Sequence, residues 1–278
     1  MTFEKLFTEY SKSDGFKKLS ESSVRSYIYG AHKLISHFGN KDIREIKRSD
    51  FIKMKDGLID TPGSANLIIR VASVMLAYAM DRDVIPANPV AGMKKNKLQG
   101  HERWTPVEVR LFLAQAEIRM ATAVALAWYT GQREGDILNM KVSDYVDGYI
   151  TLTQSKTKTE LKIKVHQDLE DFLKNAVLPN RNPEDYIVSG SKKMNSSYFR
   201  QLFSAESKKV GIEKVFHGIR KGVASSLAEN GRPISEIAAI LGHKSMRMAA
   251  YYAEQASGTK LAESAVSNLT SIIVPATY

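Results

Sequence analysis

Apolar residues in the first part of the chain recur every three or four positions, which is the period of an amphipathic helix. Residues 19–39 carry one such repeat, and Ser20 and Ser22 at its start are candidate amino-terminal caps. A second long helix is predicted to open at Pro62, because proline suits the first helical turn. Shorter repeats predict helices over 3–10 and 49–58. A helical domain is therefore predicted over residues 1–90.

A second domain begins at residues 105–108, which read Thr-Pro-Val-Glu and form a capping box with proline in the first helical turn. Helices are predicted from there to about Asn139. Apolar and polar residues then alternate with the period of strands over 149–154 and 161–166, with a polar turn between them. The helical period returns over 169–177, 196–211, 217–229, 234–241 and 246–254. We therefore predict a mainly α fold with a small antiparallel β-sheet, in which residues 104–257 form a mixed α/β domain.

Residues 91–103 carry glycines and lysines without apolar periodicity, and we interpret them as a basic interdomain linker. Lys94, Lys95 and Lys97 are either solvated side chains of this linker or cations that contact the phosphates of a nucleic acid. The chain has 40 Lys and Arg against 30 Asp and Glu, hence a net charge of +10 and a pI near 9.5. This balance favours a polyanionic partner, DNA or RNA first, although a basic protein without such a partner fits it equally well.

The composition excludes several kinds of chemistry. With no cysteine among 278 residues, disulfides, thiolate catalysis and cysteine-ligated zinc are ruled out, and a cytoplasmic location is favoured. No apolar run approaches the roughly 20 residues that span a bilayer, so no membrane association is predicted. The length favours two domains, each with its own core.

Three clusters of polar residues in the second domain stand at spacings that suit chemistry. Arg133 follows a glycine turn in the sequence Thr-Gly-Gln-Arg-Glu-Gly-Asp, at the end of an apolar helix. His217 and Arg220 are three residues apart, which puts imidazole and guanidinium on one face of a helix. His243 ends the triplet Leu-Gly-His, and Tyr252 follows nine residues later. Each residue alone is more often a surface or packing residue, so only the set carries a functional prediction.

This ordered set resembles the tyrosine recombinase, or phage integrase, family. The family signature is an arginine in a Thr-Gly-x-Arg segment, a hairpin lysine, His-x-x-Arg, and Leu-Gly-His with a tyrosine nine residues later; all are present within about residues 104–255. The likeness is closest to lambda-like integrases. The first hundred residues match only as a small helical core-binding domain that clamps DNA. Because that domain begins almost at Met1, the resemblance implies a chain that lacks the arm-binding domain, either a simple recombinase or a shortened chain.

The resemblance implies that DNA is cleaved without metal, cofactor or ATP. Attack on a phosphodiester builds negative charge on the phosphoryl oxygens, and the guanidinium groups of Arg133 and Arg220 present paired donors that match them. His217 and His243 are expected to add hydrogen bonds and to handle the tyrosine proton, because imidazole titrates near neutral pH. Tyr252 would attack and keep the phosphate as an ester, which preserves the bond for rejoining.

Two of these assignments have competitors nearby. The family's hairpin lysine, which protonates the leaving 5′ oxygen, matches Lys156, and Lys158 in the same turn competes with it. Tyr251 adjoins Tyr252, and only the nine-residue spacing favours the latter. Asp136 is expected to orient neighbouring basic groups rather than take part in the chemistry.

The resemblance further implies double-stranded DNA as the partner, in the cytoplasm of a prokaryotic, archaeal or virus-infected cell. The chain would be a monomer or weak dimer when free and a homo-tetramer on two paired sites. Residues 258–278 form a carboxy-terminal tail, and the apolar β-branched run 272–274 predicts a short strand. This tail would dock in trans on another copy, or it would pack on its own domain.

Three other functions fit parts of the sequence. A type IB topoisomerase shares the tyrosine chemistry, but the helical first half and the Leu-Gly-His spacing favour recombination. A regulator that binds DNA without cutting it would not need the complete set of site residues. A metal nuclease is the weakest alternative, because the sequence shows no carboxylate cluster with two-metal spacing.

Overall fold

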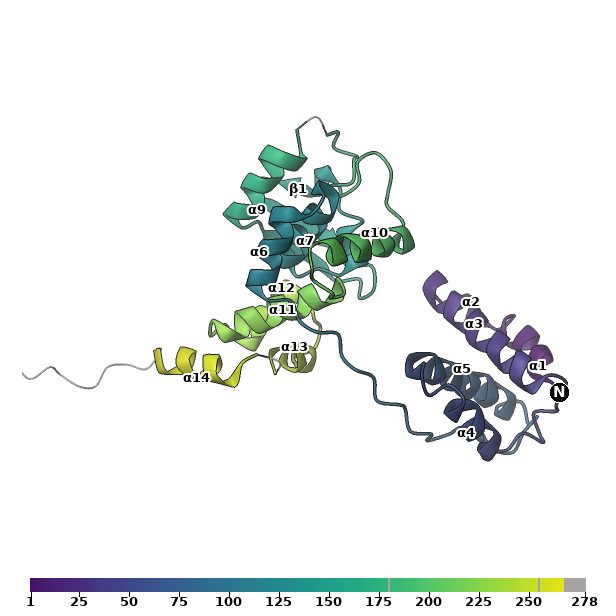
Figure 1. The fold of residues 1–278 in the computed structure, drawn as a ribbon. Coiled ribbons are helices and arrows are strands. Elements are labelled where there is room, and N and C mark those ends of the chain that lie inside the picture. The colour runs from purple at the N-terminus through teal and green to yellow at the C-terminus, as the bar shows by residue number, and fades with distance from the viewer. Residues whose placement is uncertain (180, 255, 268–278) are drawn as a thin grey trace, which may run out of the picture. The chain divides into compact units, whose positions relative to one another are not determined.

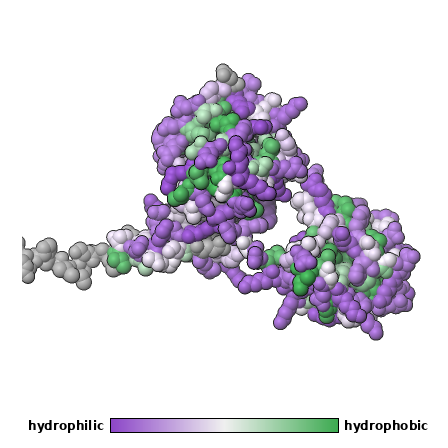
Figure 2. Space-filling view, viewed as in Figure 1, coloured by the Kyte–Doolittle hydropathy of each residue, from purple (hydrophilic) through white to green (hydrophobic). Residues whose placement is uncertain are grey.

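The structure is a computed structural model that describes residues 1–179, 181–254 and 256–267, with the side chains of residues 252 and 253 outside the description. The chain divides into two compact units, Met1–Gly100 and His101–Tyr278, which are treated in turn (Figure 1). Hydrophilic residues cover most of the face of each unit that is drawn in Figure 2.

The first unit, described throughout, folds into the helices α1 (Phe3–Tyr10), α2 (Asp14–Lys17), α3 (Glu21–Phe38), α4 (Arg48–Asp56) and α5 (Pro62–Met80). The Ser20 hydroxyl caps α3 by accepting a hydrogen bond from the Ser23 amide at 3.4 Å, and α5 opens with Pro62. Helices α3 and α5 pack together where Gly30 faces Val71. A Cβ on Gly30 would lie 2.7 Å from Cγ2 of Val71, so glycine permits this close approach.

Helix α5 is long and apolar enough to cross a membrane, judged by length and composition alone. Its residues Ile68, Val71 and Met75, however, are at most 1% exposed and belong to one core cluster with residues of α1, α3 and α4. We therefore interpret α5 as the central core helix of the first unit.

The second unit combines helices with a three-stranded sheet. Its helices are α6 (Pro106–Gln115), α7 (Ile118–Thr130), α8 (Glu134–Ile137), α9 (Gln167–Phe172), α10 (Ser196–Lys209), α11 (His217–Glu229), α12 (Ile234–Leu241), α13 (Met246–Ala253) and α14 (Gly258–Ser267). Strands β1 (Tyr145–Val146), β2 (Tyr149–Thr153) and β3 (Glu160–Lys164) pair antiparallel in that order, with Ile150 opposite Ile163. Residues 120–127 of α7 are all buried, so this helix forms the centre of the core. The predicted fold class is confirmed.

The boundaries of the elements follow the local chemistry. The capping box at the start of α6 is formed: the Glu108 amide donates to the Thr105 hydroxyl at 3.3 Å, and the Thr105 amide donates to the Glu108 carboxylate at 2.8 Å. The helix predicted over 169–177 changes character after Phe172, where a π-helical segment covers Leu173–Val177. Leu169, Leu173 and Val177, four positions apart, are all buried.

Candidate active site

Arg133 is positioned by a tight turn at the end of α7. Gly131 ends the helix in the left-handed conformation, with φ of 66°. A Cβ at this position would also lie 2.7 Å from Cδ2 of Leu241 at the end of α12. Glycine is therefore required here both by the backbone and by the approach of α12. Arg133 follows as the residue that precedes the first turn of α8.

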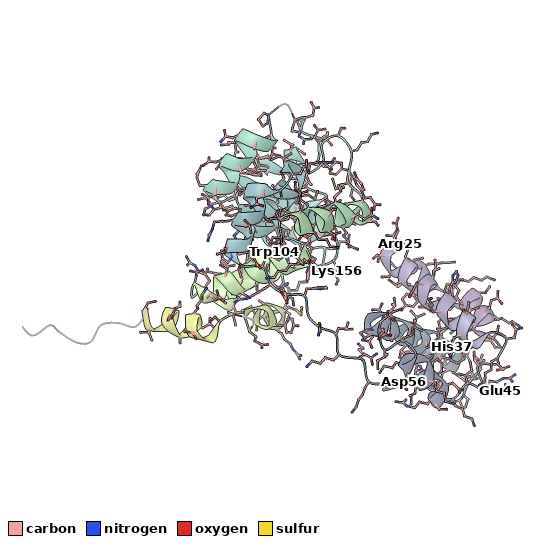
Figure 3. The ribbon with its side chains drawn as sticks, in the orientation of Figure 1. Arg25, His37, Glu45, Asp56, Trp104 and Lys156 are labelled. Atoms are coloured by element: carbon pink, nitrogen blue, oxygen red, sulfur yellow. The ribbon has the colours of Figure 1, made fainter. Side chains whose placement is uncertain are left out.

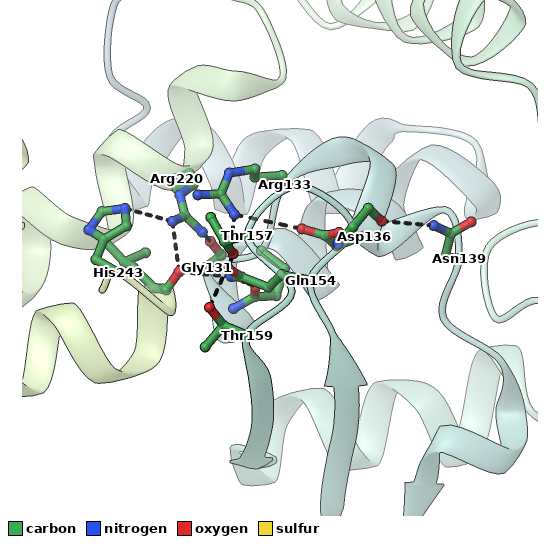
Figure 4. Close-up of polar contacts among 12 residues, drawn as sticks. Gly131, Arg133, Asp136, Asn139, Gln154, Thr157, Thr159, Arg220 and His243 are labelled. Carbon is green, nitrogen blue, oxygen red and sulfur yellow. Dashed lines mark hydrogen bonds and ion pairs between the residues drawn. The ribbon is translucent and has the colours of Figure 1, made fainter. Parts of the chain in front are cut away.

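Arg220 joins three segments that are distant in the sequence (Figure 4). The side chain is buried, and it donates from Nη1 to the Gly131 carbonyl and from Nη2 to the Leu241 carbonyl, each at 2.7 Å. Nη2 also lies 2.7 Å from Nε2 of His243. Because a guanidinium only donates, this nitrogen of His243 accepts, and the neutral ring carries its proton on Nδ1. The positive charge of Arg220 is thus fixed beside the turns that carry Arg133 and His243.

The buried side-chain amide of Gln154 connects Arg133 to the end of α12. Its Oε1 accepts hydrogen bonds from Nη1 of Arg133 at 3.0 Å and from the hydroxyl of Thr157 at 2.5 Å. Its Nε2 donates to Oε1 of Gln132 at 2.6 Å and to the Leu241 carbonyl at 2.9 Å. Gln154 therefore fixes the position of the Arg133 guanidinium relative to the end of α12 (Figure 4).

Gln132 and Gln154 were not among the predicted site residues, although the sequence carried a signal for each. Gln132 occupies the variable position of the Thr-Gly-x-Arg segment, and Gln154 is the last residue before the turn with the two lysines. Gly242, inside the Leu-Gly-His triplet, is left-handed, and a Cβ there would lie 2.6 Å from Nε2 of Gln154. The triplet needs its glycine because the buried amide occupies that space.

Asp136 connects Arg133 to the turn between β2 and β3. Its Oδ1 accepts a hydrogen bond from the Ser155 amide at 2.7 Å, and its Oδ2 lies 3.9 Å from Nη1 of Arg133. Lys156 follows in this turn as an exposed side chain on the surface of the second unit (Figure 3). Lys158 is exposed as well and has a positive φ of 54°. The structure thus places the lysine turn beside Arg133, and the Lys158 amide donates to the Gln154 carbonyl at 2.9 Å, but no hydrogen bond within the described residues brings the ammonium of Lys156 or Lys158 into the network.

His217 opens α11 and faces a basic cavity of about 700 Å³. The cavity is also lined by His101, Arg133, Arg200, Lys208 and Lys214. Burial lowers the pKa of His217 to about 4, and the charges of Arg220, His101, Lys221 and Arg133 act in the same direction. Burial, followed by the charges of Arg220 and Arg133, also lowers the pKa of His243 to about 4. Both imidazoles are therefore neutral at pH 7.

Helix α13 carries the two candidate tyrosines. It packs against α11 and α12, and Ala249 on it is fully buried. The side chain of Tyr251 is half exposed. The side chain of Tyr252 lies outside the described residues, so the structure places the predicted nucleophile by its backbone alone, on the helix that follows His243.

Lys94, Lys95 and Lys97 lie in the last residues of the first unit, where the backbone is irregular and the side chains are exposed. The ammonium of Lys55 on α4 donates to the Lys94 carbonyl at 2.5 Å, which holds this segment against its own unit.

Comparisons with known proteins agree on one family. The model of the phage integrase family matches residues 103–258, which is more than half of the chain. The integrase of Enterobacteria phage 434 is 27% identical over 272 residues, which cover 91% of this chain and 76% of that protein. A probable integrase/recombinase protein of Methanocaldococcus jannaschii is 26% identical over 284 residues, which cover 90% of this chain and 84% of that protein.

Solved structures show the same likeness in three dimensions. Residues 75–356 of lambda integrase, a dimer bound to a COC′ core site, match with a TM-score of 0.79 and 25% identity, over 91% of this chain and 95% of that chain. A lambda integrase tetramer bound to a Holliday junction matches with a TM-score of 0.78 and 25% identity, over 91% and 77% of the two chains.

Proposed function

The chain belongs to the phage integrase family, and from this we propose that its site cuts and rejoins DNA at specific sequences through a 3′-phosphotyrosine. The observation that carries the proposal is the buried guanidinium of Arg220. It holds the Gly131 turn, the end of α12 and the imidazole of His243 around one fixed positive charge. Such an arrangement suits stabilisation of the charge that develops on a phosphoryl group under attack.

The proposed reaction exchanges one phosphoester for another. The phenolic oxygen of Tyr252 bonds to phosphorus, the bond to the 5′ oxygen breaks, and Lys156 gives that oxygen its proton. Arg133 and Arg220 stabilise the charge on the remaining phosphoryl oxygens, which is why no metal or ATP is proposed. Rejoining reverses these steps with the 5′ hydroxyl of a second strand as the nucleophile.

The tyrosine proton needs an acceptor, and we assign this role first to His217. A neutral imidazole offers one acceptor nitrogen, and the lowered pKa keeps His217 neutral at pH 7. His243 is neutral too, but its Nε2 already accepts from Arg220 at 2.7 Å. In this assignment His243 and Asp136 serve mainly to hold the two arginines in position.

DNA and further copies of the chain are the proposed partners. Lambda integrase is solved as a dimer on a core site and as a tetramer on a Holliday junction, and its fold is shared over 91% of this chain. We propose that this chain is a monomer or weak dimer when free and a homo-tetramer on two paired sites. Residues 1–90 would bind DNA as the core-binding domain, linked through 91–103 to the catalytic domain, with Lys94, Lys95 and Lys97 on the phosphates. The proposed location is the cytoplasm.

The carboxy-terminal tail is proposed to couple neighbouring copies. Residues Gly258–Ser267 form α14, whose apolar side chains Leu261 and Val266 are exposed. The predicted strand at 272–274 lies outside the described residues. Deletion of residues 272–278 is expected to weaken assembly on paired sites while single-site binding stays intact, and unchanged pairing would count against the coupling.

Covalent capture tests the proposed function. Purified protein is incubated, with a chelator present, with a library of duplexes that each carry a nick near one possible cleavage site. The short strand beyond the nick diffuses away after cleavage. Its 5′ hydroxyl is then no longer present to reverse the reaction, so the tyrosine ester accumulates. An adduct that resists denaturant, formed on a narrow set of sequences, is the expected result. DNA binding without any adduct would instead identify a regulator, and adducts without strand exchange between two sites would favour a topoisomerase.

A further inference from the structure

The first residues of the second unit, 101–104, lie along α11, the helix that carries His217 and Arg220. The Trp104 amide donates to the Gly218 carbonyl at 3.1 Å, and its indole nitrogen donates to the Val215 carbonyl at 3.2 Å. Trp104 is 1% exposed and packs on Phe112 and Phe203 in the core. We call residues 101–104 the anchor segment, because their contacts fix the chain to α11 where the second unit begins.

Two glycines of α11 make room for the anchor segment. Gly218 and Gly222 are one helical turn apart, and both have ordinary helical backbone angles, so conformation alone does not require glycine. A Cβ on Gly218 would collide with the Glu102 carbonyl oxygen, and a Cβ on Gly222 would collide with the Trp104 carbonyl oxygen. The backbone of the anchor segment therefore lies in a groove that only two small residues can provide.

A buried lysine fastens the start of the anchor segment. Lys221 is 6% exposed, and its ammonium donates to the His101 carbonyl at 2.8 Å. A buried cation is costly unless it is compensated, so a lysine with no other function would be a poor choice at this position. Lys214, three residues before α11, and Glu229, the last residue of α11, both contact Arg103 in the anchor segment. The Lys214 ammonium donates to the Arg103 carbonyl at 2.9 Å, and the Arg103 guanidinium donates to the Glu229 carboxylate at 2.6 Å.

The start of the anchor segment lies beside the active site. The ring of His101 meets the ring of His217 edge to face with 6.2 Å between centroids, and both rings line the basic cavity with Arg133. We propose that the anchor segment is a positioning element for the catalytic helix, with Lys221 as the residue that fastens it and sets the orientation of His217. This inference rests on the proposed function, because His217 is assigned a role in the reaction.

The charges around His217 give the proposal a readout that a purely structural contact would lack. The groups that face this imidazole are Arg220 and Lys221 on α11, His101 on the anchor segment and Arg133 before α8, and all of them lower its pKa. Removal of the Lys221 charge should raise the pKa of His217. A proton acceptor with a higher pKa is protonated at a higher pH, so cleavage should then begin to fail at a higher pH than in the natural protein.

The test compares Lys221→Met, which removes both the contact and the charge, with Lys221→Arg, which keeps a donor and the charge. Lys174→Met in the π-helical segment is the matched control, because it removes a lysine that is paired with Glu170 away from the cavity. The titration of His217 in each free protein is followed by imidazole NMR, which does not depend on activity. Adduct formation at saturating nicked DNA is timed from pH 5 to pH 8.

For Lys221→Met we expect a raised His217 pKa, an acid limb of the rate profile displaced to higher pH, and DNA affinity close to natural. The rate at pH 7.5 should fall by about 10- to 100-fold, the size of effect that a small misplacement of a reacting group produces. Lys221→Arg should recover most of the rate and the natural profile. An unchanged titration with an equal loss at every pH would overturn the proposal and leave Lys221 a packing residue.

Gly222→Ala tests the same segment without touching a charge. The added methyl group should lift the anchor segment, speed hydrogen exchange of the Trp104 amide and slow adduct formation. Gly258→Ala is the control, because a Cβ at Gly258 meets nothing within 4 Å. Natural exchange and natural rates in Gly222→Ala would overturn the proposal. If the natural protein forms no adduct, the proposed function fails, while the exchange and titration results still show whether the segment positions His217.

Discussion

Arg220 carries a charge that is almost fully buried, and its guanidinium donates to two backbone carbonyls and to the neutral ring of His243. A positive charge held in this way has strong attraction for a phosphate, because little water screens it. We therefore expect Arg220 to contribute strongly to catalysis although its side chain is almost fully buried.

Arg220→Lys tests this expectation. Lysine keeps the charge but cannot bridge the Gly131 and Leu241 carbonyls and His243 with one planar group. We expect adduct formation to fall by about 100-fold or more, the usual effect of a lost donor at a developing oxyanion, while DNA affinity changes little. Arg119→Lys, at an exposed ion pair with Glu117, is the matched control and should behave as the natural protein. If Arg220→Lys forms the adduct at the natural rate, Arg220 does not have the proposed role in the reaction.

The two site histidines also make stability depend on pH. Their pKa values of about 4 in the folded protein lie below the ordinary value of 6.5. Between these values the unfolded chain binds more protons than the folded one, so folded stability falls as pH is lowered from 6.5 toward 4. The melting temperature should decline over this window. His243→Gln should give a shallower decline, and an identical slope would show that His243 is not neutral in the folded protein.

At the scale of elements, the site is assembled by two left-handed glycines that end α7 and α12. Gly131→Ala should lose about 1–2 kcal/mol from the left-handed backbone and a further roughly 1–3 kcal/mol because Leu241 must move. Gly148→Ala is the matched control, since Gly148 has φ of 76° with nothing within 4 Å of an added Cβ. Chemical denaturation measures both variants. Equal losses would mean that the approach of α12 to Gly131 contributes nothing to stability.

Local pattern accounts for most of the elements, and the reasons for the exceptions are physical. The long helices and the β2–β3 pair were predicted because their periodicity extends over several turns or a full strand. Helix α2 has four residues and β1 two, which are too short for periodicity to register, and α14 lies in a tail for which only a strand was predicted. The capping box at Thr105 was predicted because its chemistry is local.

The sequence predicts the residues of the candidate site that belong to recognisable motifs, but not the residues that contact them from elsewhere in the chain. Arg133, Arg220 and His243 were selected by spacing and resemblance, and the structure brings them into one network. Gln154 could not be found in the same way, because its partners Gln132 and Leu241 are 22 and 87 positions away. Contacts over such separations depend on the tertiary fold. A glutamine at the end of a strand carries no periodicity that would single it out.

In the whole chain, the segment between the two compact units is attached on both sides. On the side of the first unit, Asn66 donates to the Asn96 carbonyl at 2.9 Å and accepts from the Asn96 amide at 2.7 Å. On the other side, the anchor segment is fixed to α11. Residues 97–100 lie between these attachments and are all exposed. We therefore infer that any hinge motion is concentrated in these residues rather than spread over 91–103.

Limited digestion with trypsin tests the position of the hinge. The first cut is expected after Lys97, because a protease needs an exposed backbone that can adapt to its active site. Lys97→Gln should slow the first cut, whereas Lys95→Gln should not, and DNA should protect the site if the two units clamp it. First cuts within 149–166, the β2–β3 region, would contradict this placement.

We propose that DNA becomes linked to the phenolic oxygen of Tyr252, and covalent capture with two matched variants tests this link. Tyr252→Phe and Tyr251→Phe each remove one oxygen atom from neighbouring positions on α13. On the same nicked duplex, Tyr252→Phe should bind DNA with natural affinity and form no adduct, while Tyr251→Phe should form it at close to the natural rate. An adduct retained by Tyr252→Phe and lost by Tyr251→Phe would contradict the claim and move the nucleophile by one residue.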